Sequence, residues 1–80
     1  MKAILEFDLS DHDGKMEHMR CVKALSMAIA LWDMEQYLRA SIKHAPDSMS
    51  SEAYGMLNEV RDKFYEIMND NNIDLDELLN

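Results

Sequence analysis

The sequence predicts a mainly α-helical fold, in which a short N-terminal β-strand precedes a helical bundle of two to three helices within one domain, residues 1–80. The chain includes only two Gly and one Pro, so few turns interrupt it. Apolar side chains recur at helical spacing through most of the sequence. Hydrophobic residues make up 48% of the chain, which is typical of a folded domain rather than a disordered segment.

The β-strand is predicted over residues 2–9, where Leu5, Phe7 and Leu9 alternate with acidic side chains. A single strand leaves both of its edges unpaired, so it needs a second strand beside it. We expect that second strand in the C-terminal "NIDLD" at 72–76, in another copy of the chain or in a binding protein.

The first helix is predicted over residues 12–21, because Ser10, Asp11 and Asp13 before and at its start are capping residues. It ends near residue 22 or continues into the next helix. The side chains expected to point inward are Met16, Met19 and Cys21.

The central helix is predicted over residues 22–43, which contain neither Gly nor Pro. One apolar stripe consists of Met27, Leu31, Met34, Leu38 and Ile42, and a second apolar face consists of Leu25, Ile29 and Trp32. A helix that is apolar on two faces is usually covered on more than one side.

The last helix is predicted over residues 50–69, after a loop in which Pro46 ends the central helix. Ser50 or Ser48 caps its start, and its stripe consists of Ala53, Leu57, Val60, Phe64 and Ile67. The short loop favours an antiparallel hairpin of the two long helices. The amides near residue 70 end the helix, since Asn tolerates the left-handed conformation, and residues 70–80 form an acidic tail.

The charge balance is strongly acidic, with 16 Asp and Glu against 8 Lys and Arg and a net charge of −8. This disfavours direct binding to nucleic-acid phosphates, which requires a basic patch. The acidic charge has three possible explanations, which are simple solubility, mimicry of nucleic acid and binding of a basic protein partner. The acidic partner surface is expected to consist of Asp62, Glu66, Asp70, Asp74, Asp76 and Glu77.

The segment 66–77 has the length of a calcium loop but not its ligands. With Glu77 as the twelfth ligand position, Met68 replaces a required oxygen ligand and Asn71 replaces the Gly of the sharp turn. Near the N-terminus, His18 and Cys21 share a helix face, but one Cys without a zinc spacing indicates neither a metal site nor a nucleophile. We therefore expect no metal, no cofactor, no catalytic residue and no enzymatic activity.

Two groups of apolar side chains have alternative interpretations. Trp32 is either a core residue or an interface anchor, and the eight Met are either adaptable core or a binding face. A small core and an unpaired strand favour a homodimer. The self-interface or partner interface is expected to include Phe7, Leu25, Ile29 and Trp32.

A soluble, cytoplasmic protein is expected. The start of the chain is soon acidic, which is untypical of a signal peptide, and the longest apolar run, at 27–32, is far shorter than a membrane span. A single Cys also fits a reducing compartment.

The chain resembles a group of short, uncharacterised acidic proteins of tailed bacteriophages. The resemblance is carried by "ILEFDL" at 4–9, "ALWDMEQYLR" at 30–39, Lys43 and "EVRDKFYEIMNDNNIDLDEL" at 59–78. The matching positions are Glu6, Phe7, Leu9, Leu31, Trp32, Asp33, Leu38 and Arg39, while Ser10 stands where the group usually has Pro. The resemblance implies a phage origin and a location in the host cytoplasm, and it implies no activity.

Two functions are consistent with these features. The first is a non-enzymatic protein-binding accessory factor that modulates or inhibits a host protein complex, such as a defence system. The second is a self-assembling structural or scaffold protein without a host target.

Overall fold

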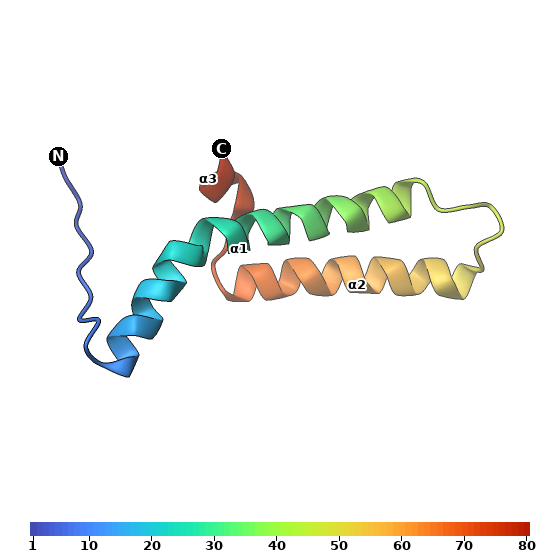
Figure 1. The fold of residues 1–80 in the computed structure, drawn as a ribbon. Helices are drawn as coiled ribbons and strands as arrows, with labels where there is room; N and C mark the ends of the chain where they lie inside the picture. The colour runs from blue at the N-terminus through green and yellow to red at the C-terminus, as the bar shows by residue number, and fades with distance from the viewer.

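The computed structural model describes all 80 residues. Most of them form three α-helices, and none forms a β-strand (Figure 1). Helix α1 spans His12–Lys43, α2 spans Ser51–Asp70 and α3 spans Leu75–Leu79. The prediction of a mainly helical fold with two long helices is confirmed. The loop at 44–50 brings α2 back along α1 as an antiparallel hairpin. The turn at 71–74 then places α3 beside α1 (Figure 1).

Helix α1 is one continuous element, so the predicted helices at 12–21 and 22–43 are joined. Asp11 caps it, since its carboxylate accepts a hydrogen bond from the amide of Gly14 across 2.7 Å. No Pro and no further Gly follows before its end at Lys43, so nothing in the sequence breaks the helix. At 1.5 Å per residue, α1 is about 48 Å long.

The loop between the long helices follows the predicted chemistry. Helix α1 ends before Pro46, whose fixed ring and missing amide hydrogen prevent continuation. Ser50 then caps α2, because its hydroxyl accepts a hydrogen bond from the amide of Ala53 across 3.1 Å. The prediction of Ser50 as one of two candidate caps is confirmed.

The core lies where the three helices meet. Ala28, Met68 and Leu75 are buried together, one from each helix, and Leu38 is buried further along the hairpin. The half-buried side chains packed around the three-helix cluster are Leu31, Trp32, Phe64, Ile73 and Leu79. Burial of these apolar surfaces is the main source of stability for the hairpin.

The predicted apolar stripes are only partly correct. Met27 and Met34 on α1 and Val60 and Ile67 on α2 are exposed. In a hairpin, one helix covers only one side of its neighbour, so an apolar stripe that is wider than the contact leaves its edge in water. Met19 and Cys21 are also exposed rather than inward, because no other helix packs against the first half of α1.

The predicted acidic tail is wrong, because residues 75–79 form α3. Asn72 adopts the left-handed conformation, with φ of 55°, and turns the chain after α2, as the amides predicted. Asp74 then caps α3 by accepting hydrogen bonds from the amides of Asp76 and Glu77. Leu75, which is 5% exposed, holds α3 against the two long helices through its contacts in the buried cluster.

The predicted β-strand at 2–9 is also wrong. Residues 1–8 form no ladder, and "NIDLD" belongs to the turn and to α3, so it offers no strand to pair with. The segment folds back along the start of α1, where the rings of Phe7 and His18 lie 5.6 Å apart. Ser10 fixes the turn by donating hydrogen bonds from its hydroxyl and its amide to Asp8, and these bonds lower the pKa of Asp8.

The molecule is elongated for its size. Its dimensions are 56 × 30 × 19 Å and its radius of gyration is 17.9 Å, against about 12 Å for a compact domain of this length. Its accessible surface is 6927 Å², roughly 1,900 Å² more than the ~5,000 Å² expected for a folded monomer of this mass. The exposed apolar residues that contribute to this surface include Ile4 and Leu5 of the N-terminal segment and Val22 and Leu25 in the first half of α1.

Candidate interaction surfaces

The first half of α1 projects beyond the hairpin (Figure 1). Residues 12–27 extend about 24 Å before the first residue buried against the other helices, Ala28. We call five side chains along residues 18–32 of α1 the projecting stripe; they are His18, Val22, Leu25, Ile29 and Trp32. Their spacing of 4, 3, 4 and 3 residues places them on one side of the helix.

Most of the projecting stripe is open to solvent. Val22 is 65% exposed, Leu25 62% and Ile29 45%. Trp32 is half-buried and packs against the core cluster, so one part of its ring system belongs to the core and the rest remains accessible. Three predicted interface residues, Leu25, Ile29 and Trp32, therefore lie on one helix face, and Phe7 lies next to it through its contact with His18.

An open groove adjoins the stripe where the N-terminal segment leaves α1. It encloses about 380 Å³ and is lined by Leu9, Lys15, His18, Met19 and Val22. Sequence reasoning missed this continuation of the stripe, since a helix boundary near residue 22 separated His18 and Val22 from Leu25. The regular spacing from 18 to 32 is the signal that would have revealed it.

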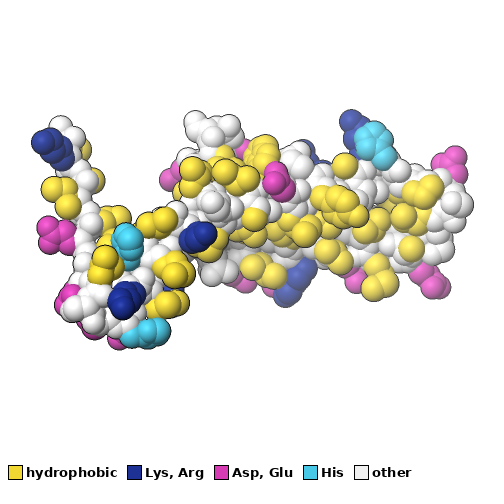
Figure 2. Space-filling model, in the orientation of Figure 1, with side chains coloured by type: hydrophobic (Ala, Val, Ile, Leu, Met, Phe, Trp, Pro, Cys, Tyr) yellow, Lys and Arg dark blue, Asp and Glu magenta, His cyan; other side chains and the backbone are white.

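A second apolar surface lies on the hairpin itself. Figure 2 shows hydrophobic side chains on the visible face of the hairpin, over both long helices. We call five of the exposed side chains the hairpin face; they are Met27 and Met34 of α1, and Met56, Val60 and Ile67 of α2. Three of the five are Met, whose flexible side chains adapt to different partner surfaces.

The predicted acidic surface divides into two parts. Asp62, Glu66 and Asp70 follow each other at four-residue spacing along α2, on the side opposite the buried Met68. We call these three residues the acidic row. Arg61 lies 3.2 Å from Asp62 and Lys63 lies 3.3 Å from Glu66, so two of the three carboxylates have local ion pairs.

The remaining predicted acidic residues belong to the start of α3. The carboxylate of Asp74 is occupied in capping that helix, and Asp76 and Glu77 lie in its first turn. Negative charge at this position interacts favourably with the helix dipole. Asp74 is therefore a helix cap, and these three residues lie at the start of α3 rather than in the acidic row on α2.

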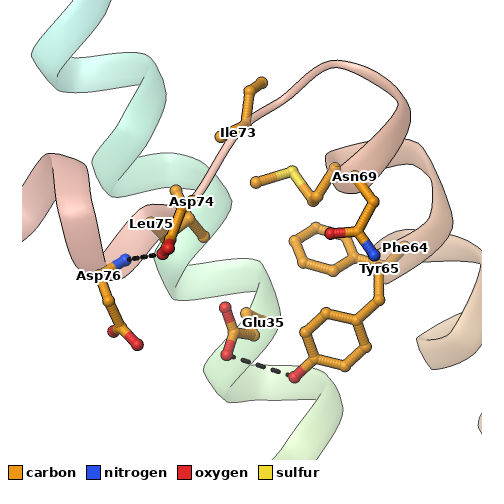
Figure 3. A pocket seen from close by; sticks show the side chains of 9 residues that line it. Glu35, Phe64, Tyr65, Asn69, Ile73, Asp74, Leu75 and Asp76 are labelled. Atoms are coloured by element: carbon orange, nitrogen blue, oxygen red, sulfur yellow. Dashed lines mark hydrogen bonds between the residues drawn. The ribbon is translucent and has the colours of Figure 1, made fainter.

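A small pocket lies between α1, α2 and the turn before α3 (Figure 3). It encloses about 220 Å³, and Glu35, Tyr65 and Asp74 are among its lining residues. The hydroxyl of Tyr65 points toward Glu35 and donates a hydrogen bond to it across 3.3 Å. Partial burial and the neighbouring Glu35 carboxylate raise the pKa of Tyr65.

Arg39 also pairs with Glu35, at 3.5 Å. Across the chain, no group of three or more His, Cys, Asp or Glu side chains is arranged to hold a metal ion. The thiol of Cys21 is exposed. The former calcium-loop candidate, residues 66–77, is divided between the end of α2, a turn and α3.

Comparisons with family models, with curated proteins and with solved structures found no match. None of the helices combines the length and the apolar character that crossing a bilayer requires.

Proposed function

We propose that this chain is a small acidic, non-enzymatic protein-binding factor of phage origin, which modulates or inhibits a protein complex of the host, such as a defence system. The observation that carries the proposal is the amount of apolar surface left uncovered. Only five residues are buried, while large apolar side chains are exposed on both halves of α1 and on α2. Exposed apolar patches of this extent are typical of protein-binding surfaces.

The hairpin face and the acidic row indicate the chemistry of the host partner. Met-rich apolar surfaces bind apolar side chains, and an acidic row attracts basic residues around them. The partner is therefore a protein with an apolar patch that is bordered by Lys or Arg. Binding of this kind requires no catalytic group on either side.

A matched set of variants tests this proposal. The wild-type chain is immobilised and incubated with lysate of a bacterial host, beside Met34→Glu, which places a charge in the hairpin face. A control, Tyr37→Glu, alters an exposed side chain of the same helix outside that face. We expect one host protein, at a fixed stoichiometry after purification of the complex, with the wild type and the control but not with Met34→Glu.

The alternative function is a self-assembling structural protein without a host target, and the uncovered projecting stripe favours it. The same experiment separates the two functions. Recovery of this chain alone, together with large assemblies in light scattering, would contradict the host-binding function and support the structural one.

A further inference from the structure

We propose that a second copy of this chain covers the projecting stripe, as an antiparallel helix pair with two-fold symmetry and Leu25 on the axis. This inference rests on the proposed protein-binding role of the uncovered apolar surface and names the occupant of one part of it. The hairpin face and the acidic row remain free for a host protein.

The exposed surface of the chain is large enough to include an interface with a second copy. A stable interface removes about 800 Å² from each partner, and the whole chain exposes roughly 1,900 Å² more than a compact monomer of its mass. The projecting stripe and the adjoining groove are part of this exposed surface. A chain with five buried residues has a small core, and oligomerisation is a common source of stability in such small domains.

The spacing of the projecting stripe fits a paired helix. Steps of 4, 3, 4 and 3 residues from His18 to Trp32 are the pattern of the seam in a two-helix coiled coil. The stripe spans about 21 Å along the axis. Val22, Leu25 and Ile29 of the stripe are exposed, and Trp32 at its end packs against the core cluster.

The register is self-complementary. When two copies run antiparallel with Leu25 opposite Leu25, His18 lies opposite Trp32, and Val22 lies one residue out of step with Ile29, about 1.5 Å along the axis. Each of these pairs occurs twice, as two-fold symmetry requires. Phe7, which packs on His18, would then lie near Trp32 of the second copy and complete an aromatic cluster at each end.

Charge selects the antiparallel orientation. Lys15 and Asp33 are 18 residues apart, which is about five helical turns, so both lie on the same flank of the stripe. Both are exposed, and neither forms an ion pair within its own chain. Antiparallel pairing puts this flank of both copies on the same side of the pair and brings Lys15 of each copy close to Asp33 of the other. Parallel pairing puts the two flanks on opposite sides of the pair, so neither copy's Lys15 would reach an Asp33.

The oligomeric state of the full chain is the first measurement. Sedimentation equilibrium at 100 µM should give twice the chain mass of 9.3 kDa, and a 9.3 kDa species at that concentration would overturn the proposal. Val22→Glu, at a position that is 65% exposed in the single chain, should weaken self-association at least about 100-fold with unchanged helicity. Tyr37→Glu, on the same helix but outside both the stripe and the hairpin face, should leave it unchanged.

A charge exchange tests the orientation. Lys15→Glu alone should weaken self-association about tenfold, because it creates two like-charge contacts with Asp33. The double variant Lys15→Glu/Asp33→Lys should restore the wild-type affinity. Failure of the double variant to recover would overturn the antiparallel register.

Cross-linking provides a second readout that does not depend on affinity. In a Cys21→Ser background, chains carrying Val22→Cys are mixed with chains carrying Ile29→Cys and oxidised. The antiparallel register predicts disulfides mainly between the two kinds of chain. Disulfides mainly between chains of the same kind would overturn it. All of these measurements use the isolated chain, so their failure is distinguishable from failure to bind a host protein.

Discussion

The phenolic hydroxyl of Tyr65 on α2 and the carboxylate of Glu35 on α1 form the only hydrogen bond between the two long helices, across 3.3 Å. Glu35 also pairs with Arg39 one turn further along α1, at 3.5 Å. Everything else that holds the hairpin together is apolar contact around Ala28, Leu38 and Met68. A single exposed hydrogen bond of this kind adds little to the free energy of unfolding.

Removal of the Tyr65 hydroxyl is expected to have a small effect. Tyr65→Phe keeps the ring and loses one hydrogen bond at a site that water reaches, so the free energy of unfolding should fall by about 0.5 kcal/mol. Tyr37→Phe is the matched control, because Tyr37 is exposed and its hydroxyl has no hydrogen-bond partner. Urea unfolding followed by circular dichroism measures both. A loss above about 2 kcal/mol for Tyr65→Phe would contradict this account.

The same pair predicts a pH dependence on the alkaline side. Partial burial, and then the negative charge of Glu35, raise the pKa of Tyr65 above its ordinary value of 10.0. Between the unfolded and the folded pKa, the unfolded chain has lost the proton and the folded chain has kept it, so stability falls as pH rises. The wild type should therefore lose more stability than Tyr65→Phe when melting is followed from pH 8 to above 10. Equal losses would show that Tyr65 does not contribute.

The anchor of α3 offers a comparison within one helix. Leu75 is 5% exposed and belongs to the core cluster, whereas Leu78 in the same helix is 59% exposed. Leu75→Ala should cost about 2–4 kcal/mol, because it leaves a cavity between the helices. Leu78→Ala should change stability by less than about 0.5 kcal/mol. Thermal melting of the two variants compares them directly, and equal effects would mean that α3 does not pack as described.

Calcium should leave the stability unchanged. Glu66 lies inside α2 and pairs with Lys63, and the Asp74 carboxylate is occupied by backbone amides. These carboxylates are therefore fixed in helical roles rather than arranged around a cation. Melting with millimolar CaCl₂ and with EDTA measures the effect. A shift of more than a few degrees between the two would refute this prediction.

The sequence predicts the elements that depend on interactions between neighbouring residues. It does not predict the elements that depend on contacts between residues far apart in the chain. Asp11, Ser50 and Asn72 act on their own neighbouring amides or dihedral angles, so caps and helix ends follow from residue type. Helix α3 is stabilised because Leu75 packs against Ala28 and Met68. The local sequence, a run of Asp and Asn, does not predict this contact. The prediction of a β-strand at 2–9 was wrong for a related reason. A strand needs a second strand to pair with, and no other segment of this chain forms one.

The candidate surfaces, too, were predictable only where they depend on local sequence. A helix face of Leu25, Ile29 and Trp32 is visible in the sequence because it depends on periodicity alone. Which of several apolar faces is buried depends on where α2 and α3 lie. That is why Met27 and Met34, for which the sequence leaves core and binding face open, are exposed.

The two glycines provide the last prediction, because each lies in a helix and their surroundings differ. A methyl group on Gly55 would meet no atom within 4 Å. Gly55→Ala should therefore stabilise α2 by about 1 kcal/mol, through the higher helix propensity of Ala.

The same methyl group on Gly14 would overlap the backbone carbonyl of Asp8, so Gly14 is the residue that lets the N-terminal segment fold back onto α1. Gly14→Ala should give no stabilisation and should separate Phe7 from His18, since the segment must move away. Two-dimensional NMR measures this as loss of the ring-current shift on the His18 protons, and limited proteolysis measures it as faster cleavage within residues 1–9. A stabilisation of Gly14→Ala equal to that of Gly55→Ala, with the His18 shift retained, would mean that the segment does not pack on α1 in this way.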